Sequence, residues 1–297
     1  MLIKELAQQL DDFFQIKELN KDLPFSFVLP EIFNKLNYDW RKYFSDDFLK
    51  SYHGLMLNNG VNVQKIIGTV FLDRGVLEKL FQRDEKNVLI FTHHPLEDQT
   101  AGAGFIALPE KYLQELKKRN ISVYSIHTPL DIHAKVSTVL DFAKGSGIHV
   151  SGQFIKDQTG WVGTTGHVHK HDEFDEYISF LQTTTGGNRV NFIKRTNQVG
   201  KVAVIPGGGT DPSLILEAIY LECDTYLTGE YYNKLHISHG EQERTLFERK
   251  IENTNINLIE VSHYWSERFV FQDSLKQLIT RQLQLKYEFV EQENAWY

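Results

Sequence analysis

Two adjacent histidines, His93 and His94, follow a run of four apolar residues and precede Pro95. The run 88–91 is short, rich in β-forming residues and preceded by a polar segment, which is typical of a buried strand. Neutral imidazoles are common transition-metal ligands, so a pair at a strand end is a candidate metal site. Pro95 is expected to end the strand and to let the two rings diverge toward two neighbouring ions. The alternative is a pair of loop-end histidines bonded to backbone carbonyls.

Two further predicted strands also end in polar side chains. Asp73 follows the apolar run 66–72, and His127 and Asp131 follow the run 121–126. Because parallel strands present their carboxyl ends at one edge of a sheet, these groups are expected near the histidine pair. Asp73 is equally suited to cap the helix after it. A carboxylate such as Asp131 can bridge two cations in a metal pair, but the pattern alone does not choose between His127 and Asp131 as the ligand.

The C-terminal half adds a second group of candidate ligands. Glu230 ends the short predicted strand 224–230, and a last clear strand, 257–262, is followed by His263 and Glu267. If a helix begins near residue 262, His263 and Glu267 lie four residues apart on one of its faces. They then supply one nitrogen and one carboxylate ligand.

Other histidines give weaker patterns. His167, His169 and His171 alternate along an extended segment, which places them on one side of it. A solvated or interface edge strand is favoured over a metal site there, because no carboxylate lies at strict spacing. His239 and Glu243 share a helix face within a polar stretch, and a solvated face is favoured for them too.

A glycine triplet follows the buried strand predicted over 198–205. Gly207, Gly208 and Gly209 precede a helix beginning at Pro212. Glycines permit close approach of the backbone to a neighbour or a ligand, and the helix N-terminus would favour an anion. Tight packing and anion binding are both consistent with the pattern.

The elements that must position these groups alternate between strands and helices. Apolar spacings predict helices over 2–19, 74–81, 109–119, 134–144, 174–181 and 213–221, and a terminal helix through Leu283. A helix between the strands 66–73 and 88–91 makes a βαβ unit and predicts parallel pairing. Residues 56–70 suggest a hairpin or a strand pair around Asn58-Asn59-Gly60. The pattern is that of an α/β fold.

Composition excludes several classes of protein. The chain has 297 residues, enough for a sizeable core, and its hydrophobic fraction of 41% is ordinary for a globular protein. A net charge of -7 argues against general affinity for nucleic acid. Cys223 is the only cysteine and lies in an apolar run, so it is interpreted as a buried packing thiol in a reducing compartment. Without a signal sequence or a long apolar run, a cytoplasmic protein with no membrane anchor is expected.

In order along the chain, these motifs resemble those of the NIF-three-like family, dinuclear-metal proteins also called GTP cyclohydrolase I type 2 homologues. The motifs that carry the resemblance are Leu72-Asp73, Thr92-His93-His94-Pro95, His127-Thr128-Pro129-Leu130-Asp131, Gly207-Gly208-Gly209, Thr228-Gly229-Glu230 and Ser262-His263-Tyr264-Trp265-Ser266-Glu267. Each is weak alone, but together and in this order they are specific.

The resemblance implies a ligand set and an assembly. The matching positions are His93, His94, Asp131, His263 and Glu267. It also implies a ring-like homohexamer and an α/β fold with two lobes, each a three-layer sandwich with a mixed, largely parallel sheet. The site is then expected at the strand C-terminal ends between the lobes.

The lobes are expected to be discontinuous in sequence. Residues 1–130 and 255–297 are predicted to form the first, metal-binding lobe, and residues 131–254 the second. Two departures from the family are visible. The family usually has glycine where Ser262 stands, and the segment 151–197 matches poorly.

These patterns lead to a functional expectation. Imidazole and carboxylate ligands without thiolate suit two divalent ions of Zn, Fe, Mn or Ni. The expected activity is metal-assisted hydrolysis of a small substrate such as a nucleotide or another phosphate-containing molecule, with Glu230 or His127 as a proton shuttle. The alternative is a metal-binding scaffold or regulatory interaction protein without catalysis.

Overall fold

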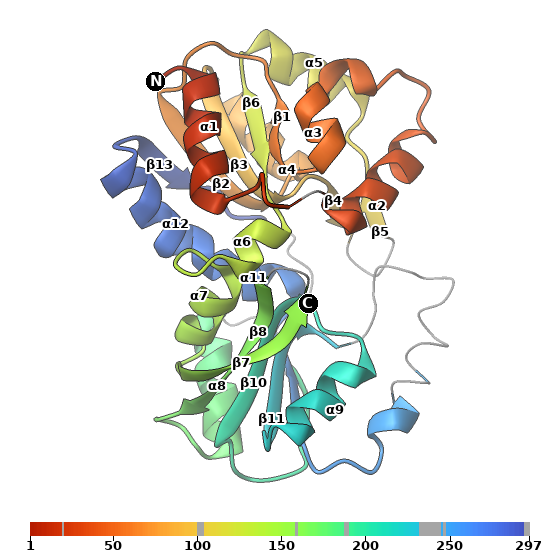
Figure 1. The fold of residues 1–297 in the computed structure, drawn as a ribbon, viewed down its shortest axis with the longest axis vertical. Helices are drawn as coiled ribbons and strands as arrows, with labels where there is room; N and C mark the ends of the chain where they lie inside the picture. Colours follow the sequence, from red (N-terminus) through yellow and green to blue (C-terminus); the bar gives the residue numbers. More distant parts are fainter. Residues whose placement is uncertain are drawn as a thin grey trace. The chain divides into compact units, whose positions relative to one another are not determined.

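The structure is a computed structural model that describes residues 1–19, 21–99, 104–157, 160–186, 190–231, 245 and 248–293. The chain divides into two compact units. Unit 1 consists of Met1–Asp98, Phe105–His133 and Ser274–Glu293, and unit 2 consists mainly of Ala134–Asp273. Each unit is an α/β layer structure built around one sheet (Figure 1). The predicted α/β fold class is confirmed.

In the part of unit 1 that the structure describes, the sheet has five strands. In spatial order they are β1 (Gly54–Leu57), β6 (Ser122–Ser125), β3 (Val88–His94), β2 (Lys65–Phe71) and β13 (Lys286–Phe289). β6, β3, β2 and β13 run parallel, and β1 is antiparallel to β6. The predicted parallel pairing of β2 with β3 is therefore confirmed, and the carboxyl ends of β2, β3 and β6 share one edge.

Helices surround this sheet. They are α1 (Ile3–Phe14), α2 (Leu23–Phe33), the 3-10 turn η1 (Arg41–Tyr43), α3 (Asp46–Ser51), α4 (Arg74–Gln82), α5 (Glu110–Lys118), α6 (Thr128–Ile132), α12 (Ser274–Gln277) and the π-helical segment η3 (Leu278–Gln282). The short strands β4 (Glu97–Gln99) and β5 (Gly104–Ile106) pair with each other.

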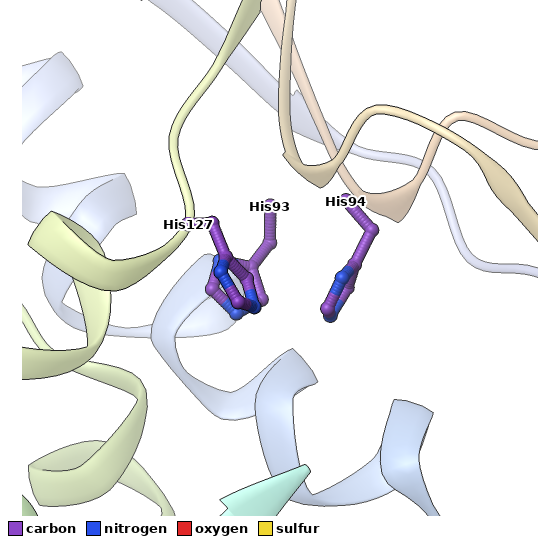
Figure 2. Close-up of side chains that lie close together, drawn as sticks. All are labelled: His93, His94 and His127. Carbon is purple, nitrogen blue, oxygen red and sulfur yellow. The ribbon is translucent and has the colours of Figure 1, made fainter. Parts of the chain in front are cut away.

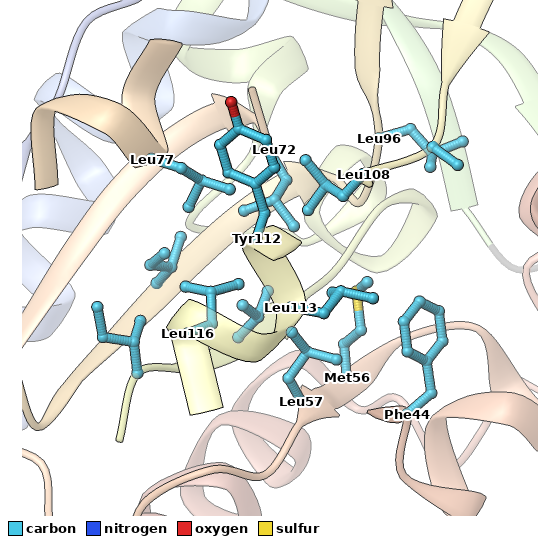
Figure 3. Close-up of a cluster of buried hydrophobic side chains, with 14 of the residues drawn as sticks. Phe44, Met56, Leu57, Leu72, Leu77, Leu96, Leu108, Tyr112, Leu113 and Leu116 are labelled. Atoms are coloured by element: carbon cyan, nitrogen blue, oxygen red, sulfur yellow. The ribbon is translucent and has the colours of Figure 1, made fainter. Parts of the chain in front are cut away.

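The core of unit 1 lies between these helices and the sheet (Figure 3). Leu77 of α4 and Leu113 of α5 are fully buried there, in the same cluster as Met56 and Leu57 of β1. Burial of each leucine side chain stabilises the fold by about 1.5–3 kcal/mol relative to exposure. This packing fixes the positions of α4 and α5, which connect β2 to β3 and β3 to β6.

Two predictions for unit 1 are wrong. β1 and β2 do not form a hairpin, because the backbone N–H groups of Asn59 and Gly60 donate to Ser122 Oγ and steer β1 toward β6. The single terminal helix is also wrong, because α11 (His263–Gln272) ends before α12 and the chain then returns as β13 beside β2.

The sheet of unit 2 has six strands among the described residues. In spatial order they are β7 (Ile148–Asp157), β8 (Gly160–Val168), β10 (Lys201–Gly208), β11 (Thr225–Glu230), β12 (Asn257–Glu260) and β9 (Asn191–Ile193). β10, β11 and β12 run parallel, and the remaining pairs are antiparallel. The carboxyl ends of the three parallel strands therefore share one edge.

The helices of unit 2 cover the sheet. Among the elements with described bounds, they are α7 (Thr138–Gly145), α8 (Phe174–Thr184), α9 (Pro212–Tyr220) and α11. Ala203 and Ile205 of β10 pack with Ile215 and Ala218 of α9 in one hydrophobic cluster. α11 contacts α7, β10 and β11, which places its first turn beside the ends of these strands.

The unit boundaries differ from the predicted lobes. Residues 255–297 were expected to return to the first lobe, but only Ser274–Glu293 belong to unit 1. β12 pairs with β11 and α11 packs on the same sheet, so both belong to unit 2. The sequence pattern does not reveal this, because α11 and α12 read as one continuous apolar helix.

One predicted segment cannot be compared with the structure, because His239 and Glu243 lie outside the described residues. Among the helices of the described ranges, none has the length and apolar character needed to cross a membrane.

Candidate metal centre

Three histidines of unit 1 come together at the carboxyl ends of β3 and β6 (Figure 2). His93 and His94 are the last two residues of β3, and His127 follows β6. One ring nitrogen from each lies within 4.8 Å of the others. The rings of His93 and His94 are buried, and the side chain of His127 is 21% exposed. This arrangement can hold a transition-metal ion.

Both adjacent histidines lie within β3, which ends at His94, so Pro95 ends the strand as predicted. Phe71 of β2 pairs with His94 in the ladder, so the sheet continues past Phe91. The rings of His93 and His94 nevertheless approach each other, with centroids 4.4 Å apart. His94 stacks on Phe71 at 4.3 Å, and this contact holds its ring in place.

Hydrogen bonding prepares His93 to act as a ligand. Its Nδ1 lies 2.9 Å from the carbonyl oxygen of Ile126, so the Nδ1–H donates and Nε2 keeps its lone pair. Nε2 lies 3.3 Å from Oδ1 of Asp131. An imidazole nitrogen of His93 and a carboxylate oxygen of Asp131 therefore lie side by side. The structure thus brings both His127 and Asp131, the two alternatives left open by the sequence, to the histidine pair.

Asp22 is a member of the group that sequence reasoning missed. Its buried Oδ2 lies 2.9 Å from Nδ1 of His127 and accepts bonds from the backbone N–H and the hydroxyl of Thr128. Burial opposes ionisation of Asp22, but the charge of His127 and these bonds lower its pKa. Nearby, burial lowers the pKa of His53 to about 4, although Asp22 acts to raise it. The sequence offers no signal for Asp22, because Asp22 lies 105 residues before its partner His127 in the chain. Its position directly before a helix is also an ordinary one for an aspartate.

Asp73 caps the N-terminus of α4. Its Oδ1 accepts hydrogen bonds from the backbone N–H groups of Gly75 and Val76 at the start of α4. The predicted helix cap is therefore confirmed, and Asp73 is not among the residues that gather around His93.

Unit 2 contains a second group of buried ionisable side chains. Glu230 ends β11, His263 begins α11 and Glu267 lies one turn further, as the spacing predicts. Nδ1 of His263 is 3.0 Å from Oε1 of Glu230, and its Nε2 is 3.0 Å from Oε1 of Glu267. Burial disfavours the imidazolium, but Glu267 and Glu230 outweigh burial and hold the pKa of His263 well above its ordinary value. A buried centre with two carboxylates and one imidazole favours a cation.

The glycine triplet packs tightly against this group. A Cβ on Gly207 would lie 2.5 Å from Oε1 of Glu267 and 3.0 Å from Nε2 of His263, and the φ angle of Gly207 is +64°. A Cβ on Gly209 would meet Thr228 and Tyr226, whereas one on Gly208 would meet open space. Tight packing is confirmed at Gly207 and Gly209, and anion binding at the following helix stays a prediction.

Ser262 is strained at the start of α11. Its φ of 92° and ψ of 152° lie in a region that residues other than glycine rarely adopt. Its hydroxyl partly compensates by accepting a hydrogen bond from the backbone N–H of Trp265 at 3.3 Å. A serine at position 262, where the family usually has glycine, therefore costs backbone conformational energy.

Replacing Ser262 by glycine is expected to stabilise the metal-free protein by about 1 kcal/mol. Glycine relieves about 1–3 kcal/mol of backbone strain. This gain exceeds the sum of two losses, a few tenths of a kcal/mol for the hydroxyl cap and the conformational entropy that glycine loses on folding. Denaturant unfolding measures the difference. Ser262→Ala is the control, since it keeps the strain, loses the cap and is expected to destabilise. A Ser262→Gly protein less stable than the parent would contradict the strain argument.

The alternating histidines of unit 2 lie elsewhere in its sheet. His167 is in β8, which pairs with both β7 and β10, so the predicted edge strand is wrong. His167, His169 and His171 are exposed, as predicted for a solvated face.

Comparison with known proteins places the chain in a family. A family model described as Duf34/NIF3 (NGG1p interacting factor 3) matches residues 30–295. A protein of Pseudomonas aeruginosa named GTP cyclohydrolase 1 type 2 homolog is 22% identical over 80% of this chain and 88% of its own length. A protein of Pyrococcus horikoshii with the same name is 25% identical over 75% of this chain and 86% of its own.

Solved structures show the same fold. The protein ybgI, described as of unknown function, superposes with a TM-score of 0.71 at 18% identity, over 99% of this chain and 100% of its own. Reduced HcgD from Methanocaldococcus jannaschii superposes with a TM-score of 0.63 at 19% identity, over 98% of each chain. With a family model spanning nearly the whole sequence and a fold shared from end to end, the chain belongs to the DUF34/NIF3 family.

Proposed function

We propose that this protein is a dinuclear metal-dependent hydrolase whose ligands are His93, His94, Asp131, His263 and Glu267. The observation that carries the proposal is that each unit holds a buried imidazole Nε2 at 3.0–3.3 Å from a carboxylate oxygen, His93 with Asp131 and His263 with Glu267. Imidazole and carboxylate donors without thiolate suit Zn, Fe, Mn or Ni.

The hydrogen bonds within each unit support this assignment. Ligating histidines usually donate their other N–H to a carbonyl or a carboxylate, which fixes the tautomer. His93 does so to Ile126, and His263 does so to Glu230. Each imidazole therefore offers Nε2 in a fixed orientation.

The residues around the ligands have separate roles. Two bound divalent ions would supply an activated water and polarise the scissile group of the substrate. Glu230 orients His263 through Nδ1, which is a positioning role. His127 is held through Nδ1 by Asp22, which leaves its Nε2 to take up or release a proton.

Glu230→Gln is expected to weaken metal binding about 10- to 100-fold. The amide oxygen still accepts from Nδ1 of His263, but the negative charge that strengthens the ligand is lost. Competition with a chromogenic chelator measures the affinity. Glu260→Gln is the matched control, because Glu260 is a buried carboxylate at the end of the adjacent strand that bonds Asn191 and Tyr231. Equal affinities of the Glu230→Gln and parent proteins would contradict the positioning role.

A substrate screen tests the activity itself. GTP is the first compound to test, because relatives at 22–25% identity are named as GTP cyclohydrolase 1 type 2 homologs, and phosphate monoesters and diesters follow. We expect turnover in the presence of Zn²⁺ or Mn²⁺ that is lost in His93→Ala and Glu267→Ala. Turnover that survives both substitutions would contradict the proposed site.

One observation favours a second candidate function, a metal-binding scaffold without catalysis. The side chains of His93, His94 and Glu267 are almost completely buried, as in sites that hold structural metals. A fully loaded protein that turns over none of the compounds, and whose metal accepts no small ligand such as azide, would support this alternative.

A further inference from the structure

Unit 2 carries a group of histidines that the proposed function does not use. His149 of β7 and His167 of β8 are direct partners in an antiparallel ladder, so their side chains share one face of the sheet. His169 follows two residues after His167. The three side chains are exposed.

Two of the three rings are close to each other. The ring centroids of His149 and His169 lie 4.3 Å apart, with the planes at 84°. Nδ1 of His167 lies 3.5 Å from the hydroxyl of Ser151 on the neighbouring strand. Exposed rings at this separation can turn about χ1 and χ2 to direct one nitrogen each toward a common ion.

Charged side chains lie beside these rings. His149 and His169 line a cavity of about 500 Å³ together with Lys144, Lys170 and His171. The ammonium of Lys144 is paired with the carboxylate of Asp273, and this reduces its repulsion of a cation. His171 instead stacks on Phe180 and faces Glu176 at 3.9 Å, so it does not belong to the group.

We propose that His149 and His169, with His167 as a third donor, form a peripheral site for a divalent transition metal such as Zn²⁺, Ni²⁺ or Cu²⁺. Imidazole donors suit these ions, whereas Mg²⁺ and Ca²⁺ require oxygen ligands. Water completes the coordination, because the site is open to solvent. The shared face and the close ring contact explain why histidines, and not the lysines or threonines of an ordinary solvated face, alternate here.

Equilibrium dialysis of the metal-stripped full chain against Zn²⁺, followed by elemental analysis, tests this site. We expect a His149→Ala/His169→Ala protein to hold about one equivalent of zinc fewer than the parent. Lys170→Ala is the matched control, because Lys170 lies between His169 and His171 and supplies no imidazole. It is expected to retain the full zinc content. All three substitutions are at exposed positions, and circular dichroism checks that the fold is unchanged.

The outcome is independent of the proposed hydrolase centre. The same comparison is made in a His93→Ala/Glu267→Ala background, where the deficit caused by removing His149 and His169 should persist. In this background a second measurement follows the imidazole NMR signals, and those of His149 and His169 should broaden as Ni²⁺ is added. Equal zinc contents with and without His149 and His169, or broadening confined to other histidines, would overturn the proposal.

Discussion

Asp22→Ala is expected to destabilise the protein by about 3 kcal/mol. Asp22 is buried and accepts three hydrogen bonds through Oδ2, one from His127 and two from Thr128. Removing one partner of a buried pair costs about 3–5 kcal/mol, and the lower end applies because the side chain of His127 is 21% exposed. Denaturant unfolding of the metal-free protein measures the loss.

A matched control separates this effect from removal of any acidic residue. Asp12 is exposed and paired with Lys17 at 3.2 Å, so Asp12→Ala is expected to change stability by less than about 0.5 kcal/mol. Equal losses in the two variants would contradict the assigned role of Asp22.

The contribution of Asp22 should also depend on pH. Its pKa is lower in the folded protein than in the unfolded chain, so its stabilising effect is complete above the unfolded value of about 4. The effect is lost as the pH falls from there through the depressed folded pKa. The stability difference between the parent and Asp22→Asn should therefore shrink below pH ~4. A difference that stays constant into strong acid would show that charge is not the cause.

Gly207→Ala is expected to weaken metal binding about 100-fold, at the upper end for residues that position ligands. The new methyl group would lie 2.5 Å from Oε1 of Glu267 and 3.0 Å from Nε2 of His263, so both side chains must move. The φ of +64° adds strain for any residue with a Cβ. Chelator competition measures affinity, and unfolding experiments measure the accompanying loss of stability.

The adjacent glycine provides a control of the same chemistry. Gly208→Ala places a methyl group where no described atom lies within 4 Å, and it should bind metal like the parent. If Gly207→Ala retained full affinity, or if both variants lost it equally, His263 and Glu267 would not be ligands held in this geometry.

Much of the fold follows from local patterns in the sequence. The βαβ unit through β2, α4 and β3 was predictable because apolar runs of strand length alternate with a helical stripe. The same reasoning placed His93, His94, His127 and Asp131 at one sheet edge, where the structure finds them. The pairing of His263 with Glu267 follows from the four-residue spacing on α11.

The remaining features depend on contacts between distant residues. Asp22 reaches His127 across 105 positions, and nothing near Asp22 in sequence indicates this partner. β13 pairs with β2, although the sequence patterns predicted no strand after the terminal helix. The hydrogen bond between Glu230 and His263 depends on β11 and α11 meeting in unit 2. The assignment of residues 255–273 to that unit depends on the pairing of β12 with β11.

Metal content is the most direct test of the central claim. Untagged protein is analysed beside a His93→Ala/Glu267→Ala variant, both carrying His149→Ala and His169→Ala so that the peripheral histidines do not contribute. The proposal predicts about two equivalents of transition metal in the first protein and a loss of metal without unfolding in the variant. No metal in either protein, even after incubation with Zn²⁺ or Mn²⁺, would contradict it and leave these histidines as structural residues of the strand ends.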